Sequence, residues 1–300
     1  MTLPFDAGFG SIAAAIGDCT GLPFVALSAE PVGGGSIHRA WRLADERRHY
    51  FVKTGGIAAA PMFAAEVQGL QALSAAAVVP TPTFITLGQS GSGAFLVLEH
   101  LDLVPLNPSA GARLGTALAQ LHRITGESFG WSEDNFIGAT PQQNTPHRSW
   151  PYFFGERRLR PQLQLARQNG MDRPLVEKGY GIIERIGGFF LDYRPAPSLL
   201  HGDLWSGNAA QTRDGGPVIF DPACYYGDRE TDIAMAELFG GFPTSFYAAY
   251  RAGWPLDSGY EVRKPLYNLY HVLNHFNLFG SAYLGQAQRM IESLLTELKR

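Results

Sequence analysis

The pattern of hydrophobic and polar positions along the chain changes near His100. Before that point, short apolar runs alternate with turns. Trp41-Arg42-Leu43 and Tyr50-Phe51-Val52-Lys53 flank a charged segment, which predicts a β-hairpin. A second hairpin is predicted where Thr83–Leu87 and Ala94–His100 flank a segment of Gly, Ser and Gln. The first third of the chain is therefore expected to be mostly β.

The rest of the chain is expected to be mainly helical. One helix is predicted between the two hairpins, over about Pro61–Ala75, because apolar and small residues recur there at helical spacing. The aperiodic, Pro-containing segment Leu101–Pro108 is typical of a linker. Beyond it, periodic segments predict helices over Ser109–His122, Trp150–Asn169, Leu175–Leu191, Thr231–Gly240, Lys264–Tyr283 and Gln286–Lys299. Two short strands, Ser198–Leu200 and Pro217–Phe220, are expected to be joined by a Gly-containing turn.

This order of elements predicts an α+β fold with two lobes. Residues 1–101 would form a small β-rich lobe, residues 99–107 a hinge, and residues 108–300 a larger, mainly helical lobe. Small ligands usually bind in the cleft between two such lobes.

Composition and charge exclude several classes of protein. The 300 residues carry 24 Lys and Arg against 27 Asp and Glu, a net charge of −3, and 45% are hydrophobic. Such a chain is too apolar to be disordered and lacks the basic excess of a nucleic-acid binder. No apolar run reaches the ~20 residues of a membrane span, no basic segment precedes the first apolar stretch, and Cys19 and Cys224 indicate reduced thiols. We therefore expect a cytoplasmic protein without nucleic-acid or membrane partners.

The residues with the clearest chemistry lie in His201-Gly202-Asp203-Leu204-Trp205-Ser206-Gly207-Asn208 and in Val218-Ile219-Phe220-Asp221-Pro222. The catalytic loop of protein kinases has the same five-residue step from Asp to Asn, followed by a metal-binding Asp after a short strand. In phosphoryl transfer one carboxylate must reach the acceptor hydroxyl, while an amide oxygen and a second carboxylate bind Mg²⁺. Asp and Asn are also common in turns, so their spacing alone fits two ordinary turns as well. The surrounding His-Gly-Asp and the apolar strand that ends in Asp-Pro make the pattern more specific.

A second group of residues, in the first third, fits nucleotide phosphates. The turn Gly33-Gly34-Gly35-Ser36 can bring backbone N–H groups close to phosphate oxygens, because glycine has no Cβ. Lys53 ends the following hairpin, and Glu66 lies on the next predicted helix. In kinases such a pair holds the α- and β-phosphates. Taken singly, these residues also fit a plain hairpin turn and two surface charges, but their order along the chain favours a kinase.

With these features the chain resembles the fructosamine (ketoamine) kinases, a branch of the aminoglycoside-phosphotransferase-like kinases with a protein-kinase-like fold. The resemblance covers roughly residues 10–295. It rests on motifs at Gly33–Ile37, Phe129–Asn144, His201–Asn208 and Tyr226–Met235, and on the tail Tyr267–Gly280. The second and fourth motifs separate this family from other small-molecule kinases.

The resemblance implies roles for individual residues. Asp203 would be the base that orients or deprotonates a sugar hydroxyl, and Asn208 and Asp221 would bind Mg²⁺. The implied ATP-binding residues are Gly33, Gly34, Gly35, Ser36, Lys53, Glu66, Glu99, His100 and Leu101, of which the last three form a hinge whose backbone groups bond adenine. The implied substrate residues are Trp205, Asn274 and His275, with Trp205 as an apolar platform for the sugar.

The implied reaction moves the γ-phosphoryl group of ATP to the 3-hydroxyl of a fructosamine or ribulosamine, free or on a lysine of a glycated protein. The phosphate would then destabilise the ketoamine and release the amine, which is a deglycation repair. Some family members carry a Cys in the Gly-rich loop that links two chains. Ser36 stands in its place here, so we expect no such disulfide and a monomer or weak dimer.

Some residues also fit purely structural roles. Asp232 is expected to bond the loop at His201, and Cys224 is expected to be a small buried apolar residue. The cluster of Arg157, Arg158 and Arg160 fits a solvated helix face. Trp205 and His275 also fit packed core positions.

Two other functions stay open from the sequence. One is a kinase for another hydroxylated amine, such as choline or an aminoglycoside, because a shared fold does not determine the acceptor. The other is a non-catalytic ATP-binding scaffold, although the joint presence of Lys53, Glu66, Asp203, Asn208 and Asp221 argues against it. The short segment between Asp221 and Asp232 leaves no room for a long activation loop, so regulation by loop phosphorylation is not expected.

Overall fold

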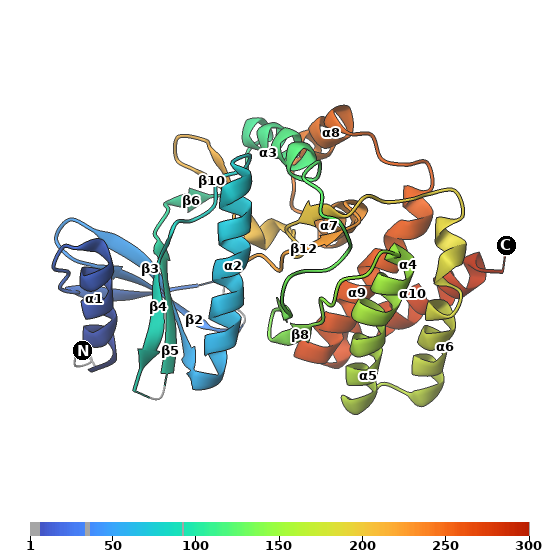
Figure 1. The fold of residues 1–300 in the computed structure, drawn as a ribbon, viewed down its shortest axis with the longest axis horizontal. Coiled ribbons are helices and arrows are strands. Elements are labelled where there is room, and N and C mark those ends of the chain that lie inside the picture. Colours follow the sequence, from blue (N-terminus) through green and yellow to red (C-terminus); the bar gives the residue numbers. More distant parts are fainter. Residues whose placement is uncertain (1–6, 34–36, 92, 300) are drawn as a thin grey trace. The chain divides into compact units, whose positions relative to one another are not determined.

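A computed structural model describes residues 7–33, 37–91 and 93–299 (Figure 1). Two compact units are formed, Met1–Pro105 with Ala209–Asp221, and Leu106–Asn208 with Pro222–Arg300. The sequence predicts lobes that are each continuous, whereas residues 209–221 group with the first unit in the structure. The functional roles expected of the two lobes stay predictions.

A three-stranded sheet brings residues 209–221 into the first unit. Its order is β11 (Pro217–Ile219), β10 (Ala209–Thr212) and β6 (Leu103–Val104). The N–H of Ile219 also donates to the carbonyl oxygen of Pro80 at 3.1 Å. Asp221, which follows β11, therefore belongs to the same unit as Lys53 and Glu66.

The first unit is built on a five-stranded antiparallel sheet in the order β1–β2–β3–β5–β4. Its strands are β1 (Ser28–Val32), β2 (Arg39–Ala44), β3 (His49–Gly56), β4 (Phe84–Ser90) and β5 (Gly93–Glu99). Both predicted hairpins are confirmed, as β2–β3 and β4–β5. In the turn between β2 and β3, the Asp45 carboxylate accepts hydrogen bonds from the N–H groups of Arg47 (2.8 Å) and Arg48 (2.6 Å), which stabilises the turn.

Helices α1 (Ala7–Thr20) and α2 (Ala60–Ala76) cover opposite faces of this sheet (Figure 1). Successive residues of a strand point to opposite faces. Accordingly, Phe95 and Val97 of β5 pack in the cluster that includes α1, whereas Leu96 and Leu98 pack with α2. The sequence predicts α2 but not α1, because the Gly- and Ala-rich α1 segment has no acidic residue in its first turn and no basic residue in its last. Packing against the sheet stabilises such a helix instead.

The second unit is mainly helical (Figure 1). Its helices are α3 (Pro108–Leu121), α4 (Trp150–Phe154), α5 (Arg160–Gln168), α6 (Arg173–Ile183), α7 (Glu230–Leu238), α8 (Thr244–Gly253), α9 (Tyr260–Phe279) and α10 (Leu284–Glu297). Two strand pairs accompany them, β7 (Asn135–Ile137) with β8 (Thr140–Gln142), and β9 (Ser198–Leu200) with β12 (Tyr225–Gly227). Among the described residues, none of the helices combines the length and apolar character needed to cross a bilayer.

The predicted joining of strands 198–200 and 217–220 by one turn is wrong. β9 pairs with β12, and β11 pairs with β10 in the first unit. β10 is hard to recognise in the sequence because Ala-Ala-Gln-Thr shows neither alternation nor a run of β-branched residues. The helix predicted over 175–191 ends at Ile183 and is followed by a 3₁₀ turn, Ile186–Phe190, where two successive glycines weaken an α-helix.

The prediction that Arg158 lies on a solvated helix face is wrong, because this residue is fully buried. Residues Gly155–Leu159 form a π-helical turn between α4 and α5, and the wider turn directs Arg158 into the core. Its guanidinium lies 4.0 Å from the ring centroid of Tyr225. It donates to the carbonyl oxygen of Gln143 (2.5 Å) and to Oδ1 of Asn144 (2.7 Å).

Candidate active site

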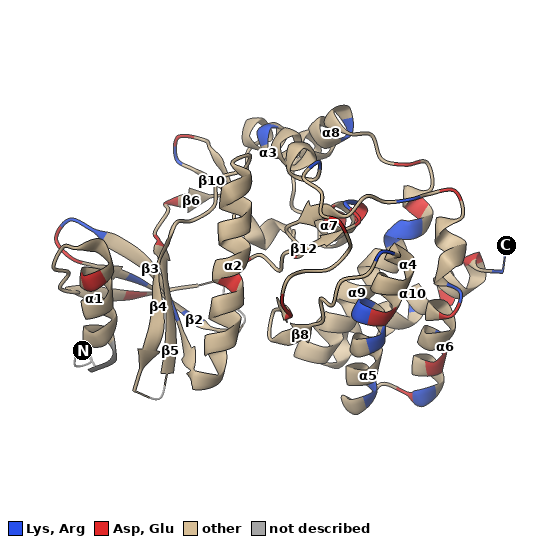
Figure 2. Ribbon diagram, viewed as in Figure 1, with Lys and Arg blue, Asp and Glu red and all other residues tan. Residues whose placement is uncertain are grey.

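Lys53 forms a buried ion pair in the first unit. β3 carries Lys53 and α2 carries Glu66, and Lys53 Nζ lies 2.8 and 2.9 Å from the two carboxylate oxygens of Glu66. Glu66 is the only charged residue of α2, and it forms the red band on that helix in Figure 2. Burial alone would lower the pKa of Lys53, but the carboxylates of Asp221 and Glu66 outweigh burial and raise it. The ammonium group therefore stays charged in a buried position.

Asp221 joins this pair from the end of β11. Its Oδ1 lies 2.6 Å from Lys53 Nζ, and its side chain is 43% exposed. Its φ of 56° lies in the left-handed region, which Asp tolerates better than most residues and which recurs at functional sites. His38 is a neighbour that the sequence gives no reason to single out. Its ring lies 4.8 Å from that of Phe63 on α2, and burial, followed by the charge of Lys53, lowers the pKa of His38.

The remaining nucleotide-binding candidates of the first unit are only partly described. Gly33 is exposed after β1, whereas Gly34, Gly35 and Ser36 lie outside the described residues. Glu99 ends β5 and is followed by His100 and Leu101. The backbone N–H of Glu99 already donates to the carbonyl oxygen of Thr83 (2.8 Å). A hinge contact to adenine would therefore use other backbone groups of residues 99–101.

Asp203 and Asn208 form a hydrogen-bonded pair in the second unit. Asn208 Nδ2 donates to Asp203 Oδ2 (3.1 Å) and to the carbonyl oxygen of Asp203 (2.9 Å). The 3₁₀ turn Ser206–Asn208 brings Asn208 back to Asp203, which explains why the five-residue step between them matters. Because the amide nitrogen faces Asp203, the amide oxygen of Asn208 points away from that carboxylate. Residues 201–208 are called the Asp203 loop below.

Asp232 of α7 holds the beginning of the Asp203 loop. Its carboxylate accepts hydrogen bonds from the N–H groups of His201 (2.8 Å) and Gly202 (2.9 Å), and from Nε2 of His122 (3.1 Å). Burial alone would raise the pKa of Asp232, but the hydrogen bond and charge of His122 and the charge of His201 outweigh it and lower the pKa. The expected structural role of Asp232 is confirmed.

Gly202 allows the Asp203 loop to approach residue 223 closely. Its φ is +84°, and a Cβ there would lie 2.0 Å from the carbonyl oxygen of Ala223. The N–H of Ala223 in turn donates to the carbonyl oxygen of His201 (2.8 Å). The neighbouring Cys224 is 1% exposed and burial raises the pKa of its thiol, which agrees with its expected place as a small buried apolar residue.

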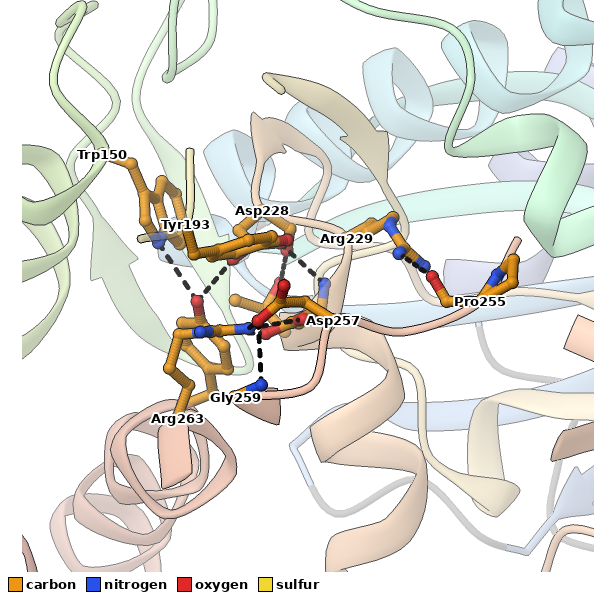
Figure 3. Close-up of polar contacts among 11 residues, drawn as sticks. Trp150, Tyr193, Asp228, Arg229, Pro255, Asp257, Gly259 and Arg263 are labelled. Carbon is orange, nitrogen blue, oxygen red and sulfur yellow. Dashed lines mark hydrogen bonds and ion pairs between the residues drawn. The ribbon is translucent and has the colours of Figure 1, made fainter. Parts of the chain in front are cut away.

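The motif at residues 226–235 also supplies buried support for α7 (Figure 3). Asp228 accepts hydrogen bonds from the hydroxyl groups of Tyr193 (3.0 Å) and Tyr267 (2.5 Å). Glu230 and Arg263 form a buried ion pair with contacts of 2.8 and 3.0 Å. These contacts tie the first turn of α7 to α9 and so support the carboxylate that holds the Asp203 loop.

The motif at residues 129–144 forms a second buried network, whose role the sequence does not reveal. Asn135 Nδ2 donates to the carbonyl oxygen of Cys224 (2.8 Å), and Gln142 Nε2 donates to that of Ala223 (3.2 Å). Gln142 Nε2 and Asn144 Nδ2 both lie 2.8 Å from Asn135 Oδ1. The β7–β8 hairpin therefore holds the backbone segment that Gly202 contacts.

The three candidate substrate residues differ in exposure. Trp205 is 36% exposed, which does not fit a packed core position, and its indole lies directly over Gly207. His275 on α9 is half-buried. Asn274 is 3% exposed, and its Oδ1 accepts a hydrogen bond from Gln162 Nε2 (3.1 Å). Its Nδ2 donates to the carbonyl oxygen of Ile137 (3.4 Å), so the contacts of Asn274 join α9 to α5 and to β7.

Comparisons with known proteins agree on one family. The model of the fructosamine kinase family matches residues 9–297. A probable ketoamine kinase of Synechocystis is 45% identical over 296 residues, which cover 98% of this chain and 99% of that protein. The chloroplastic protein-ribulosamine 3-kinase of Arabidopsis thaliana is 41% identical over 273 residues, which cover 89% of this chain and 82% of that protein.

Solved structures confirm the predicted fold class. The crystal structure of a candidate fructosamine-3-kinase from Haemophilus somnus has a TM-score of 0.90 at 32% identity and covers 98% of this chain and 100% of its own. The aminoglycoside phosphotransferase APH(4)-Ia has a TM-score of 0.61 at 17% identity, with 95% and 98% covered, and shares the fold alone. Because the family model spans nearly all of the chain, and relatives match it over most of their length, the chain belongs to the fructosamine kinase family.

Proposed function

We propose that the protein is an ATP-dependent kinase that phosphorylates the 3-hydroxyl of fructosamines or ribulosamines. The observation that carries the proposal is the pairing of Asp203 with Asn208 on a loop that Asp232 anchors. The buried pair of Lys53 and Glu66 gives it independent support. Relatives named ketoamine kinase and protein-ribulosamine 3-kinase support the acceptor class.

Asp203 would act on the acceptor hydroxyl. As the sugar oxygen forms its bond to the γ-phosphorus, the carboxylate of Asp203 accepts the hydroxyl proton. The bond from the γ-phosphorus to the bridging oxygen breaks, and ADP leaves with that oxygen. The hydrogen bond from Asn208 to Oδ2 holds the carboxylate in one orientation, and such positioning is the main contribution a protein makes to phosphoryl transfer.

Lys53 would bind the α- and β-phosphates of ATP, with Glu66 fixing the direction of its ammonium group. The turn Gly33–Ser36 would cover the phosphates, and backbone groups of residues 99–101 would bond adenine. The proposal requires these residues of the first unit to act on the same nucleotide as Asp203 and Asn208 of the second.

Asp221 and Asn208 offer oxygen atoms that suit Mg²⁺, a hard cation that takes oxygen ligands. The Asn208 amide nitrogen is already used toward Asp203, which leaves its oxygen to serve as the ligand. Mg²⁺ usually keeps waters and substrate phosphate oxygens as its other ligands. When bound, Mg²⁺ would neutralise charge on the β- and γ-phosphates.

The direct test is phosphorylation of fructosyl-lysine and ribulosyl-lysine with ATP and Mg²⁺, with the product identified by mass and phosphorus NMR. Asp203→Asn has nearly the same shape and should abolish turnover while the ATP-dependent rise in Tm remains. Asp214→Asn, at an exposed turn, should keep wild-type turnover. If Asp203→Asn also retains turnover, the assignment of the base is wrong.

The same assay separates the other functions. Phosphorylation of choline or an aminoglycoside without phosphorylation of ketoamines would move the acceptor to that class, and ATP binding without any turnover would indicate a scaffold. We also propose that the 3-phosphate leads to release of the amine, so that the enzyme repairs glycated amines and proteins in the cytoplasm. ATP-dependent loss of sugar from a glycated protein would measure this step.

A further inference from the structure

A row of partly exposed aromatic side chains begins at Trp205, two residues after Asp203. Ring centroids lie 6.4 Å apart for Trp205 and Phe239, 4.8 Å for Phe239 and His275, 5.5 Å for His275 and Phe279, and 5.1 Å for His275 and Tyr283. All five residues belong to the second unit. Contiguous exposed apolar side chains of this kind mark binding surfaces. These five residues are called the aromatic row.

The aromatic row is exposed to solvent and held in place. Trp205, Phe239 and Phe279 are 36%, 39% and 47% exposed. A Cβ on Gly207 would lie 2.3 Å from the indole of Trp205, and one on Gly241, whose φ is +94°, would lie 2.4 Å from Ser206 Oγ. The chain after Phe239 thus packs tightly against the Asp203 loop, so the row is continuous with the proposed site of phosphoryl transfer.

The faces of the aromatic row carry no cation of the protein's own. Elsewhere Arg and Lys side chains lie over aromatic rings, as Arg229 does over Trp254 at 4.1 Å. Throughout the described part of the chain, no Arg or Lys lies over a ring of the row. Such electron-rich faces attract a cationic ligand nitrogen.

His275, at the centre of the row, presents a hydrogen-bond acceptor. Its Nδ1 lies 2.8 Å from the carbonyl oxygen of His271. Since a carbonyl oxygen only accepts, Nδ1 carries the proton, and in the neutral ring Nε2 is the acceptor. Burial lowers the pKa of His275, which favours the neutral ring at pH 7. No residue in the described ranges donates a hydrogen bond to Nε2.

We propose that the aromatic row binds the amine half of the ketoamine. The protonated secondary amine lies against Phe239 and Phe279 and donates an N–H to His275 Nε2, and its alkyl substituent continues along the row. This rests on the proposed function and on the role that the family resemblance implies for Trp205, an apolar platform for the sugar. The amine nitrogen is attached to C1 of the sugar, so it extends from Trp205 toward the next ring. The amine distinguishes a ketoamine from a plain ketose, and the row is thus the source of acceptor selectivity.

Two acceptors with the same sugar test this proposal, 1-deoxy-1-propylaminofructose, which is cationic at pH 7, and 1-O-propylfructose, its neutral ether. The wild-type kcat/KM should favour the amine by about 10-fold or more, as expected for one cation–π contact with a hydrogen bond. Phe239→Leu and Phe279→Leu should each raise KM for the amine by about 5-fold and leave KM for ATP unchanged. His275→Phe keeps a ring but removes Nε2, and should also reduce the preference for the amine.

Tyr152→Leu is the matched control, because Tyr152 is an exposed aromatic residue of the same unit that stacks on His147 at 4.1 Å and lies outside the row. It should retain the wild-type preference. If the wild type uses amine and ether equally, or the three row variants keep its preference, the row does not bind the amine, although the protein remains a sugar-hydroxyl kinase. If the wild type phosphorylates neither acceptor, the proposed function itself is refuted, and this inference falls with it.

Discussion

Replacing Gly202 by Ala tests how tightly the Asp203 loop is held against residue 223. At φ of +84°, an L-residue costs roughly 1–2 kcal/mol relative to glycine. The new Cβ would also lie 2.0 Å from the carbonyl oxygen of Ala223 and 2.7 Å from its carbonyl carbon, whereas ordinary contact begins at 3.4 Å. Because both neighbours are backbone atoms, the two segments must move apart.

That movement would stretch two hydrogen bonds. One joins the N–H of Ala223 to the carbonyl oxygen of His201, and the other joins the N–H of Gly202 to the Asp232 carboxylate. A neutral hydrogen bond contributes about 1 kcal/mol and one to a charged group about 1.5–3 kcal/mol. With the backbone strain, Gly202→Ala should lower the free energy of unfolding by about 4 kcal/mol. A displacement near 1 Å at a catalytic group can also reduce turnover about 100-fold.

Gly170→Ala separates backbone strain from steric overlap. Gly170 has a φ of +94°, and a Cβ there meets nothing within 4 Å. The free energy of unfolding of this variant should therefore fall by only about 1–2 kcal/mol. Urea unfolding followed by tryptophan fluorescence measures both variants, and ketoamine turnover is measured on the folded proteins. If Gly202→Ala loses no more stability than Gly170→Ala and keeps its turnover, the loop is not held as the structure indicates.

Three further variants test the charges around the site. Lys53→Met leaves the Glu66 carboxylate buried without a partner, so the free energy of unfolding should fall by about 3 kcal/mol. If ATP raises the Tm of this variant as much as that of the wild type, Lys53 does not bind the ATP phosphates. Asp232→Asn should lower the free energy of unfolding by about 3 kcal/mol at pH 7. Because the pKa of Asp232 is lowered from 3.8, its stabilisation is complete above pH 3.8 and is lost as the pH falls further, so urea titrations of the two proteins should converge in acid. Burial lowers the pKa of His271 to about 3 from 6.5, so the unfolded chain takes up a proton below pH 6.5 that the folded chain does not. Through this group, the free energy of unfolding of the wild type should therefore fall by about 2 kcal/mol between pH 7 and pH 5. The His271→Gln variant should not show this fall. If the free energy of unfolding depends on pH equally in both proteins, His271 is not the cause.

The parts of the fold that could be predicted are those whose signals are local. The β2–β3 and β4–β5 hairpins combine short apolar runs with turn residues, and α2 has apolar residues at helical spacing. Helix α1 and strand β10 lack such local signals. They are stabilised instead by contacts with strands that are distant in sequence. The grouping of residues 209–221 with the first unit follows from the same long-range pairing, which periodicity does not record.

The candidate site shows the same limit. The pairs Lys53–Glu66 and Asp203–Asn208 were accessible to sequence reasoning, because motif order and spacing identify them, and both pairs are in contact. The burial of Arg158 could not be predicted in this way, because a π-helical turn changes the face of the helix on which a residue lies. The functions of the residues in these pairs stay predictions until their variants are measured.

The two family motifs hold two backbone segments that are hydrogen-bonded to each other, residues 201–202 and residues 223–224. Asp232, from one motif, binds the N–H groups of His201 and Gly202, while Asn135 and Gln142, from the other, bind the carbonyl groups of residues 224 and 223. The N–H of residue 223 joins the two sets through the carbonyl oxygen of His201. These anchors bind backbone groups, which every residue type except proline offers, and the residue whose side chain they restrict is Gly202, where a Cβ would overlap the carbonyl oxygen of Ala223. We therefore expect substitutions at Phe239 and Phe279, which take no part in these hydrogen bonds, to change the choice of amine without displacing the anchors.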